Sequence, residues 1–399
     1  MAAFRREDPG VEILYHGTRP ISHFVNPSRG VWPMTAAALV ILAIVSAEPP
    51  AGTDARGEVR AVWNHSGTGA YPGDWERSAK LLKQSGFNMI IANMLWAGRA
   101  HYPSDILPRS TINARYGDQI EQCLAAARRH GLQVHVWKVN YNLEGAPKTF
   151  VDKLRRQNRL QVTDDGKTEQ WLCPSHPKNL ELELESLLEV ARKYKVDGLH
   201  LDYIRYPGSD CCYCGGCRRR FEADSQREVA DWPADCRKGP RTEEYNDWRC
   251  RQITRLVASL HREGKKIRPE LKISAAVFGA YPDCRKSMAQ DWGHWIEAGY
   301  LDFVCPMNYT ENDPYFAGLL KKQLKMVDSR VPCYPGIGAT AHQSELSADR
   351  VLEQVRRTRS LGADGFTIFQ FNRRTAESLI PEVGAGLERP GTPPLREDK

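Results

Sequence analysis

The stretch with the clearest chemical potential is DGLHLDYIRYP (197–207), in which an apolar run leads into charged and aromatic residues. Alternate side chains of a strand point to opposite sides. One face is expected to carry Leu199, Leu201 and Tyr203, and the other His200 and Asp202. A buried carboxylate is costly unless it is paired or used. Asp202 is therefore predicted to act in catalysis or substrate binding.

Other expected strand ends carry aromatic, amide, cationic and acidic side chains. Aromatic faces stack on sugar rings, and amide or guanidinium groups bond to hydroxyls. This mixture predicts a sugar-binding site. The candidate substrate-binding residues are Trp63, His65, Trp96, Arg99, Lys138, Asn140, Arg205, Tyr206, Asn308, Tyr309 and Gln370.

Hydrolysis of a glycosidic bond usually needs two carboxyl groups, one of which is a general acid. Asp202 supplies one of them. The second is predicted to be Glu311, with Asp283 as the alternative and Asp313 third. The sequence gives no separation between these groups, so it leaves both retention and inversion of configuration open.

The elements that must position these residues alternate along the chain. Eight short runs rich in β-branched or aromatic residues are expected as strands: 59–64, 88–93, 133–139, 198–203, 272–278, 303–308, 332–337 and 365–371. Amphipathic helical segments are expected at 75–84, 119–129, 180–194, 289–298, 318–327, 348–361 and 376–383. This order predicts parallel βαβ units, and eight of them predict an α/β fold of the closed (β/α)₈ TIM-barrel type.

The barrel is expected to span residues 58–387, with a Cys-rich insertion at 208–241 after the fourth strand and a disordered tail at 388–399. Residues 1–57 form an N-terminal extension with a linker. Its apolar run, 36–45, is too short to span a membrane and ends in Val-Ser-Ala, which resembles a signal-peptide cleavage site. A secreted or cell-envelope (periplasmic) protein is predicted. An uncleaved signal anchor is the alternative and the only expected contact with a membrane.

The insertion contains the segment CCYCGGC, and the chain has 11 cysteines in all. Cys214, Cys217, Cys236 and Cys250 would give four thiolates for a structural zinc ion. Two disulfides in an exported loop, or free thiols, are the alternatives. No cofactor is expected for catalysis itself.

The charge of the chain argues against nucleic acid as a partner. Its formal net charge is +7 over 399 residues, and lysine and arginine are spread along the helical segments instead of forming a basic run. The expected partner is a polysaccharide or other glycan.

Several segments together resemble the glycosyl-hydrolase-like family 10. They are RAVWNH (60–65), ANMLWAGRAHYPSDILP (92–108), HGLQVHVWKVNYN (130–142), DGLHLDYIRYP (197–207) and FVCPMNYT (303–310). The resemblance extends over about residues 57–375. It implies an exported or envelope TIM barrel linked to bacterial glycan degradation. It also implies that Asp202 is the principal catalytic carboxylate and that Arg99, Asn140 and Asn308 line the donor sugar.

DGLHLDYI is also similar to the DGxDxDxE signature of family 18 chitinases, but the glutamate position of that signature is Ile204 here. The substrate-assisted arrangement of those enzymes therefore does not carry over. The predicted function is an exported glycoside hydrolase acting on a polysaccharide, with peptidoglycan glycan strands as a candidate. A non-catalytic carbohydrate-binding barrel is the alternative. A metal-dependent hydrolase is disfavoured because the first strand offers a lone His65 and no HxH pair.

Overall fold

The computed structural model describes residues 57–387. They all belong to one of the two compact units of the chain, Glu48–Lys399. The predicted extension, signal peptide or anchor, and tail lie almost entirely outside the described residues. Within 57–387, no helix combines the length and the apolar character needed to cross a membrane.

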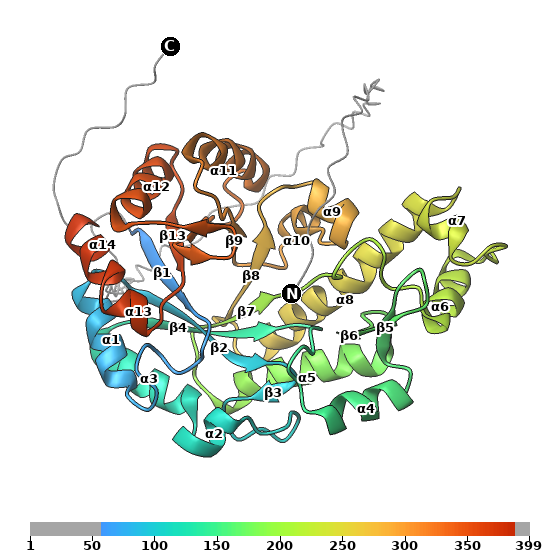
Figure 1. Cartoon of the computed structure of the whole chain (residues 1–399), viewed down its shortest axis with the longest axis horizontal. Coiled ribbons are helices and arrows are strands. Elements are labelled where there is room, and N and C mark those ends of the chain that lie inside the picture. The colour runs from blue at the N-terminus through green and yellow to red at the C-terminus, as the bar shows by residue number, and fades with distance from the viewer. Residues whose placement is uncertain (1–56, 388–399) are drawn as a thin grey trace, which may run out of the picture. The chain divides into compact units, whose positions relative to one another are not determined.

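Eight parallel strands close into a barrel, as the sequence predicts (Figure 1). Neighbouring strands pair in order around the barrel, and closure comes from the pairing of the first strand with both the second and the last. The strands are β1 (Val59–Asn64), β2 (Met89–Trp96), β4 (Gln133–Val139), β7 (Gly198–Asp202), β8 (Lys272–Phe278), β9 (Phe303–Met307), β10 (Gly336–Gly338) and β13 (Gly365–Phe369).

A ring of helices covers the outside of these strands. The helices between and after the barrel strands are α1 (Trp75–Gln84), α2 (Thr111–Tyr116), α3 (Gln119–His130), α5 (Pro177–Lys193), α8 (Thr242–Ile267), α9 (Asp283–Met288), α10 (Trp292–Glu297), α11 (Asp313–Val327), α12 (Ala348–Ser360), α13 (Arg373–Ala376) and α14 (Leu379–Leu387). Their starts follow local rules. For example, Asp118 caps α3 by accepting the backbone N–H groups of Ile120 and Glu121.

Strand alternation divides the core into two parts. Val62, Ile90 and Leu199 face the helices, whereas Trp63, Ile91 and Trp137 belong to the packed barrel interior. His200 lies in that interior, where it accepts the indole N–H of Trp63 at 3.1 Å and pairs with the Ser274 hydroxyl at 2.9 Å.

Five of the eight expected strands have different bounds, and two of these differences have a clear physical cause. The seventh strand was expected at 332–337 but is β10, Gly336–Gly338, because Pro332 and Pro335 have no N–H to donate to a ladder. β7 ends at Asp202, and Tyr203 turns into the left-handed region with φ 51°. Tyr203 consequently packs against the barrel interior and does not share the outer face of Leu199 and Leu201, which corrects that expectation.

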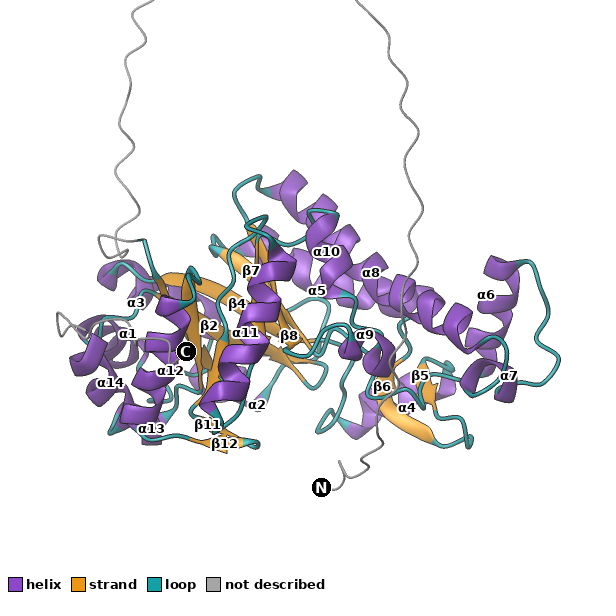
Figure 2. Cartoon of the chain, turned by 90° about the horizontal axis from the view of Figure 1, so that it is seen from above, coloured by secondary structure: helices purple, strands orange, loops and turns teal. Residues whose placement is uncertain are grey.

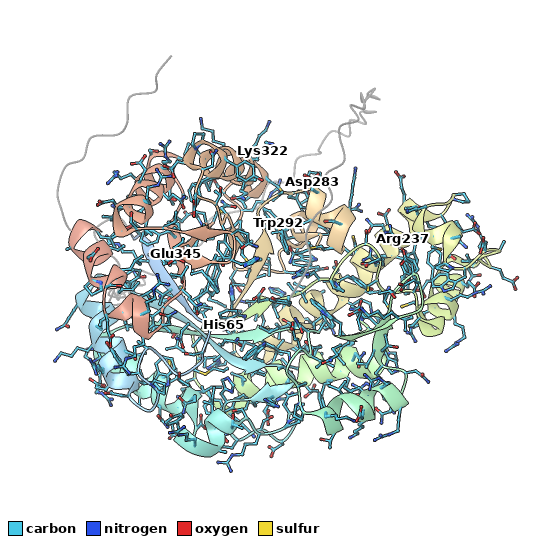
Figure 3. The ribbon with its side chains drawn as sticks, in the orientation of Figure 1. His65, Arg237, Asp283, Trp292, Lys322 and Glu345 are labelled. Atoms are coloured by element: carbon cyan, nitrogen blue, oxygen red, sulfur yellow. The ribbon has the colours of Figure 1, made fainter. Side chains whose placement is uncertain are left out.

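Two insertions lie side by side on one side of the barrel (Figure 2). The predicted one, 208–241, contains α6 (Gly215–Ser225) and α7 (Ala234–Arg237) and ends where α8 begins. The other follows β4 and has no counterpart in the sequence prediction; because it comes earlier in the chain, it is called the first insertion, and 208–241 the second insertion. It contains α4 (Lys148–Arg156) and a hairpin of β5 (Leu160–Val162) and β6 (Thr168–Leu172). The Arg237 side chain joins the insertions by donating to Asp164 at 2.6 Å (Figure 3).

Candidate active site at the barrel mouth

Asp202 ends β7 on the interior side and is 6% exposed. Active sites of TIM barrels form at this carboxyl end of the strands. The backbone N–H of Tyr203 donates to Asp202 Oδ1 at 2.6 Å. Three non-glycine residues with positive φ follow neighbouring strands here: Ala97 after β2, Tyr141 after β4 and Tyr203 after β7. Such backbone strain is concentrated at functional sites.

Burial raises the pKa of Asp202 to about 6, although the Tyr203 N–H, the Arg205 charge and the Trp137 indole each act in the opposite direction. Arg205 does not neutralise the carboxylate in an ion pair. Its guanidinium donates to the Tyr206 carbonyl at 3.0 Å and lies over the rings of Tyr203 and Phe278, at 4.7 and 5.0 Å from their centroids. Asp202 is thus poised to exchange a proton near neutral pH.

One wall of the mouth is aromatic. His65 packs against Trp96 and Trp137, with ring centroids 5.2 and 5.6 Å apart. Burial lowers the pKa of His65, which favours the neutral imidazole. Trp96 is 41% exposed, so its indole can meet a ligand. Tyr309 packs on Phe369 at 5.4 Å. His65 also contacts Phe369, so these contacts join His65, Trp96 and Tyr309 in one aromatic cluster, and Figure 3 shows His65 near the centre of the barrel.

The other wall contains Trp171 of β6, which sequence reasoning missed. Its ring lies 5.6 Å from that of Tyr203, and the Arg205 guanidinium is 5.3 Å from its centroid. The only local signal is the aromatic residue in EQWLC (169–173), a segment far from any expected strand end. Its place at the mouth depends on the fold of the first insertion.

Three other predicted substrate-binding residues lie on the outer face of the strands, where they contact side chains of the covering helices. Lys138 lies 3.4 Å from Glu183 of α5, and Asn140 donates to the same carboxylate at 2.6 Å. Asn308 exchanges two hydrogen bonds with Gln323 of α11, at 2.9 and 2.7 Å. Strand alternation explains this placement, since Trp137 and Met307 take the interior positions beside Lys138 and Asn308. These contacts favour a structural role for all three residues.

The remaining predicted contacts divide into two groups. Trp63 and Tyr206 are fully buried, with Trp63 bonded to His200 and Tyr206 beneath the Arg249 guanidinium at 4.4 Å. Arg99 and Gln370 are half-buried. The side chains of Arg99, on the short β3 (Arg99–Ala100), and of Gln370 make no hydrogen bond or ion pair with any residue of the described range. Arg99 and Gln370 are therefore better placed than the two buried residues to meet a ligand.

The predicted partner carboxylates lie elsewhere. Glu311 is exposed and accepts the backbone N–H of Glu345 at 3.0 Å. Asp283 is exposed at the start of α9, as Figure 3 shows. Asp313 is paired with Arg350 at 3.0 Å. Two tyrosines lie close enough to feel the charge of Asp202. Burial raises the pKa of Tyr203 and of Tyr309, and the negative charge of Asp202 raises both further.

Two of the four cysteines predicted as zinc ligands lie together in the structure. Cys214 and Cys217 come together with Cys173 and Cys212, and the four sulfur atoms all lie within 4.8 Å of one another. Cys236 and Cys250 do not belong to this cluster. Cys173 comes from the first insertion, so no spacing within 208–241 could have identified it.

A closed eight-stranded parallel barrel with a buried carboxylate and aromatic walls at its mouth is the architecture of glycoside-hydrolase-like TIM barrels. The chain belongs to the family described as Glycosyl hydrolase-like 10, whose model matches residues 58–339. The family resemblance predicted from the sequence is therefore confirmed.

Among curated proteins, the chain is similar to glycosyl hydrolase DigH of Escherichia coli, with 24% identity over 263 residues, which is 57% of this chain and 56% of DigH. It is also similar to glycosyl hydrolase YngK of Bacillus subtilis, with 22% identity over 289 residues, covering 63% of this chain and 54% of YngK. The chain thus spans about half the length of these curated relatives.

Solved structures share the fold at low identity. The glycoside hydrolase domain of PgaB (BpsB) from Bordetella bronchiseptica superposes with a TM-score of 0.66 at 13% identity, covering 81% of this chain and 98% of that domain. The α-L-fucosidase isoenzyme 2 of Paenibacillus thiaminolyticus gives a TM-score of 0.59 at 16% identity, covering 83% of this chain and 49% of that one.

Proposed function

We propose that this protein hydrolyses glycosidic bonds in a polysaccharide, with Asp202 as a general acid. The observation that carries the proposal is the burial of the Asp202 carboxylate at the aromatic mouth of the barrel, which raises its pKa to about 6. A carboxyl group that stays protonated to near neutral pH can donate its proton to the oxygen of the leaving sugar. Trp96 and Trp171 provide ring faces on which neighbouring sugars can stack.

The glycan strand of peptidoglycan is the candidate substrate, and the site of action is proposed to be outside the cytoplasm. Support for this comes from the family resemblance and from the signal-like sequence that ends at Ala47. The N-terminal sequence of protein recovered from its native cell should then begin at Glu48. A mature chain that begins at Met1 or Met34 would contradict export by cleavage.

A non-catalytic carbohydrate-binding barrel is the second candidate function. One observation favours it: the predicted partner carboxylates, Glu311 and Asp283, are both exposed, and Glu311 accepts the backbone N–H of Glu345. Two-carboxylate hydrolysis requires a separation of roughly 5–10 Å between the two groups. Such a barrel would retain the aromatic walls and bind glycan without releasing product.

Product release from a panel of polysaccharides, including peptidoglycan stripped of its peptides, tests both candidates. Wild type should release reducing sugar. Asp202→Asn should be slower by about 10²–10⁴-fold, the usual contribution of a general acid. Asp283→Asn, which changes an exposed carboxylate on α9, is the matched control and should keep the wild-type rate. Equal rates for wild type and Asp202→Asn would refute the proposal. Glycan retention without release would favour the binding barrel.

A further inference from the structure

We propose that Cys173, Cys212, Cys214 and Cys217 bind one Zn²⁺ ion, which ties the two insertions together beside the barrel mouth. This proposal does not depend on the proposed catalytic activity. The first support is the spacing of the sulfur atoms. Four thiolates bound to zinc at about 2.3 Å lie about 3.8 Å apart in a tetrahedron. Cys173 Sγ lies 3.4 Å from Cys217 Sγ and 4.0 Å from Cys214 Sγ, and all four lie within 4.8 Å of one another.

The four ligands come from two segments that are far apart in sequence. Cys173 directly follows β6 of the first insertion, whereas the others form a C-x-C-x-x-C sequence at the start of α6 in the second. Backbone contacts already bring these segments together. Tyr213 N–H donates to the Val162 carbonyl at 2.7 Å, and Asp164 N–H donates to the Asp210 carbonyl at 3.0 Å. An ion at the cluster would therefore cross-link two segments that backbone hydrogen bonds already hold side by side.

Hydrogen-bond donors surround the sulfur atoms, as is usual for thiolates bound to a metal. Val162 N–H donates to Cys212 Sγ at 3.4 Å, and Cys217 N–H donates to Cys214 Sγ at 3.3 Å. The Ser175 hydroxyl lies 3.3 Å from both Cys173 Sγ and Cys217 Sγ. Ser175 in turn accepts a hydrogen bond from Arg220 Nε at 3.1 Å, which brings a positive charge close to the cluster.

The cluster is closed on most sides but has an entry path. Cys173, Cys212 and Cys217 are fully buried, while Cys214 is half-buried. Cys214 also lines a cavity of about 520 Å³ between the two insertions. A complete set of four ligands with no open position is typical of structural zinc sites. The expected role is therefore to hold the insertions together and to supply no reactive water.

The site also fixes one wall of the barrel mouth. Trp171 precedes Cys173 by two residues and packs against Tyr203 and Arg205 at the end of β7. Holding Cys173 in place limits where the β6 end of the first insertion can move. The ion would thereby keep Trp171 against Arg205.

Two disulfides among the same cysteines are the competing arrangement. A disulfide needs its two sulfur atoms about 2.05 Å apart, and each of the four cysteines is a free thiol in this structure. The two arrangements differ in metal content, mass and thiol reactivity, so one preparation of the full chain distinguishes them.

The test is the metal content of the full chain, purified without a metal-affinity step after growth with zinc. Wild type should hold about one zinc ion per chain by elemental analysis, and Cys217→Ser should lose it. Cys250→Ser, which changes a buried cysteine outside the cluster, is the matched control and should keep the ion. Ser175→Ala, which removes a hydroxyl beside two sulfur atoms, should weaken zinc binding by about 10- to 100-fold in chelator competition.

A measurement on wild type alone guards against variants that do not fold. Titration with a mercurial should release zinc in proportion to the number of cluster thiols that are modified. Release should be complete when all four cysteines of the cluster have reacted. Wild type without zinc, with an intact mass short by two hydrogens for each of two bonds, would overturn the proposal in favour of disulfides. Wild type without zinc and with four reactive thiols would overturn it as well.

Discussion

At the carboxyl ends of the barrel strands, polar side chains lie both on the interior face and on the outer face. The two faces differ in the partners that these side chains have. On the outer face, Lys138 forms an ion pair with Glu183, which also accepts a hydrogen bond from Asn140. Asn308 is hydrogen-bonded to Gln323, so each of these groups has a partner from a covering helix. Inside, Asp202 has no ion pair in the described range, and Arg205 bonds to a backbone carbonyl. A buried carboxylate without an ion-pair partner and with a raised pKa marks the candidate site.

The largest effect that would sharpen this contrast is expected at Lys138. Lys138→Met should lower the free energy of unfolding by about 3–5 kcal/mol, because it leaves the Glu183 carboxylate buried without its cation. Chemical denaturation measures this loss. KM for a confirmed glycan should stay within about twofold, since the pair lies behind β4. A large rise in KM with unchanged stability would move Lys138 into the substrate site.

The next effect concerns the interior carboxylate and depends on pH. The native pKa of Asp202 is about 6 and the ordinary value is 3.8. The native state therefore holds its proton more tightly than the unfolded chain, and the wild-type stability falls as pH rises from about 4 through 6. Asp202→Asn removes this loss. The stability of the variant relative to wild type should therefore be greater at pH 8 than at pH 4 by about 2.5 kcal/mol.

Denaturant titrations of wild type and Asp202→Asn at both pH values give that difference. Asp283→Asn serves as the control, because replacing an exposed side chain should change the free energy of unfolding by less than about 0.5 kcal/mol at either pH. If Asp202→Asn changed the free energy of unfolding equally at pH 8 and pH 4, burial would not raise the pKa of Asp202, and this prediction would be wrong.

The smallest expected effect lies at the exposed edge of the mouth. Trp96→Ala should raise KM about tenfold, or about 1.4 kcal/mol, because a sugar ring loses one stacking face. Stability should change by less than about 0.5 kcal/mol, since the Trp96 side chain is 41% exposed. Tyr315→Ala, which also removes an exposed aromatic residue, but from α11, is the control and should leave KM unchanged. A Trp96→Ala enzyme with wild-type KM would place the glycan on the other wall.

The sequence was sufficient for the barrel and for Asp202, because both follow from local patterns. β1, β4 and β8 begin and end at the predicted residues, and the alternation in DGLHLDYI placed Asp202 in the interior. The same alternation, applied to Lys138 and Asn308, would have assigned them to the outer face. Polar character at a strand end predicts a substrate contact, but the register of the strand determines which face the side chain takes.

The rest depended on contacts between distant segments. Cys173 and Trp171 reach the cysteine cluster and the mouth only because the two insertions pack together. Cys236 and Cys250 satisfied the expected ligand count but not the three-dimensional arrangement. Tyr203 left its predicted face because β7 ends one residue earlier, with a positive φ. Each of these outcomes is set by tertiary packing, which residue spacing does not report.

If burial at the barrel mouth makes Asp202 a general acid, the protonation of Asp202 should control the rate of cleavage. The pH dependence of kcat/KM on a glycan that the wild type cleaves tests this claim most directly. The rate is expected to fall above about pH 6, because the raised pKa of Asp202 sets that limb of the profile. Asp202→Asn should lack both the limb and most of the activity. A rate that stays constant from pH 5 to about pH 8, or normal turnover by Asp202→Asn, would contradict the claim.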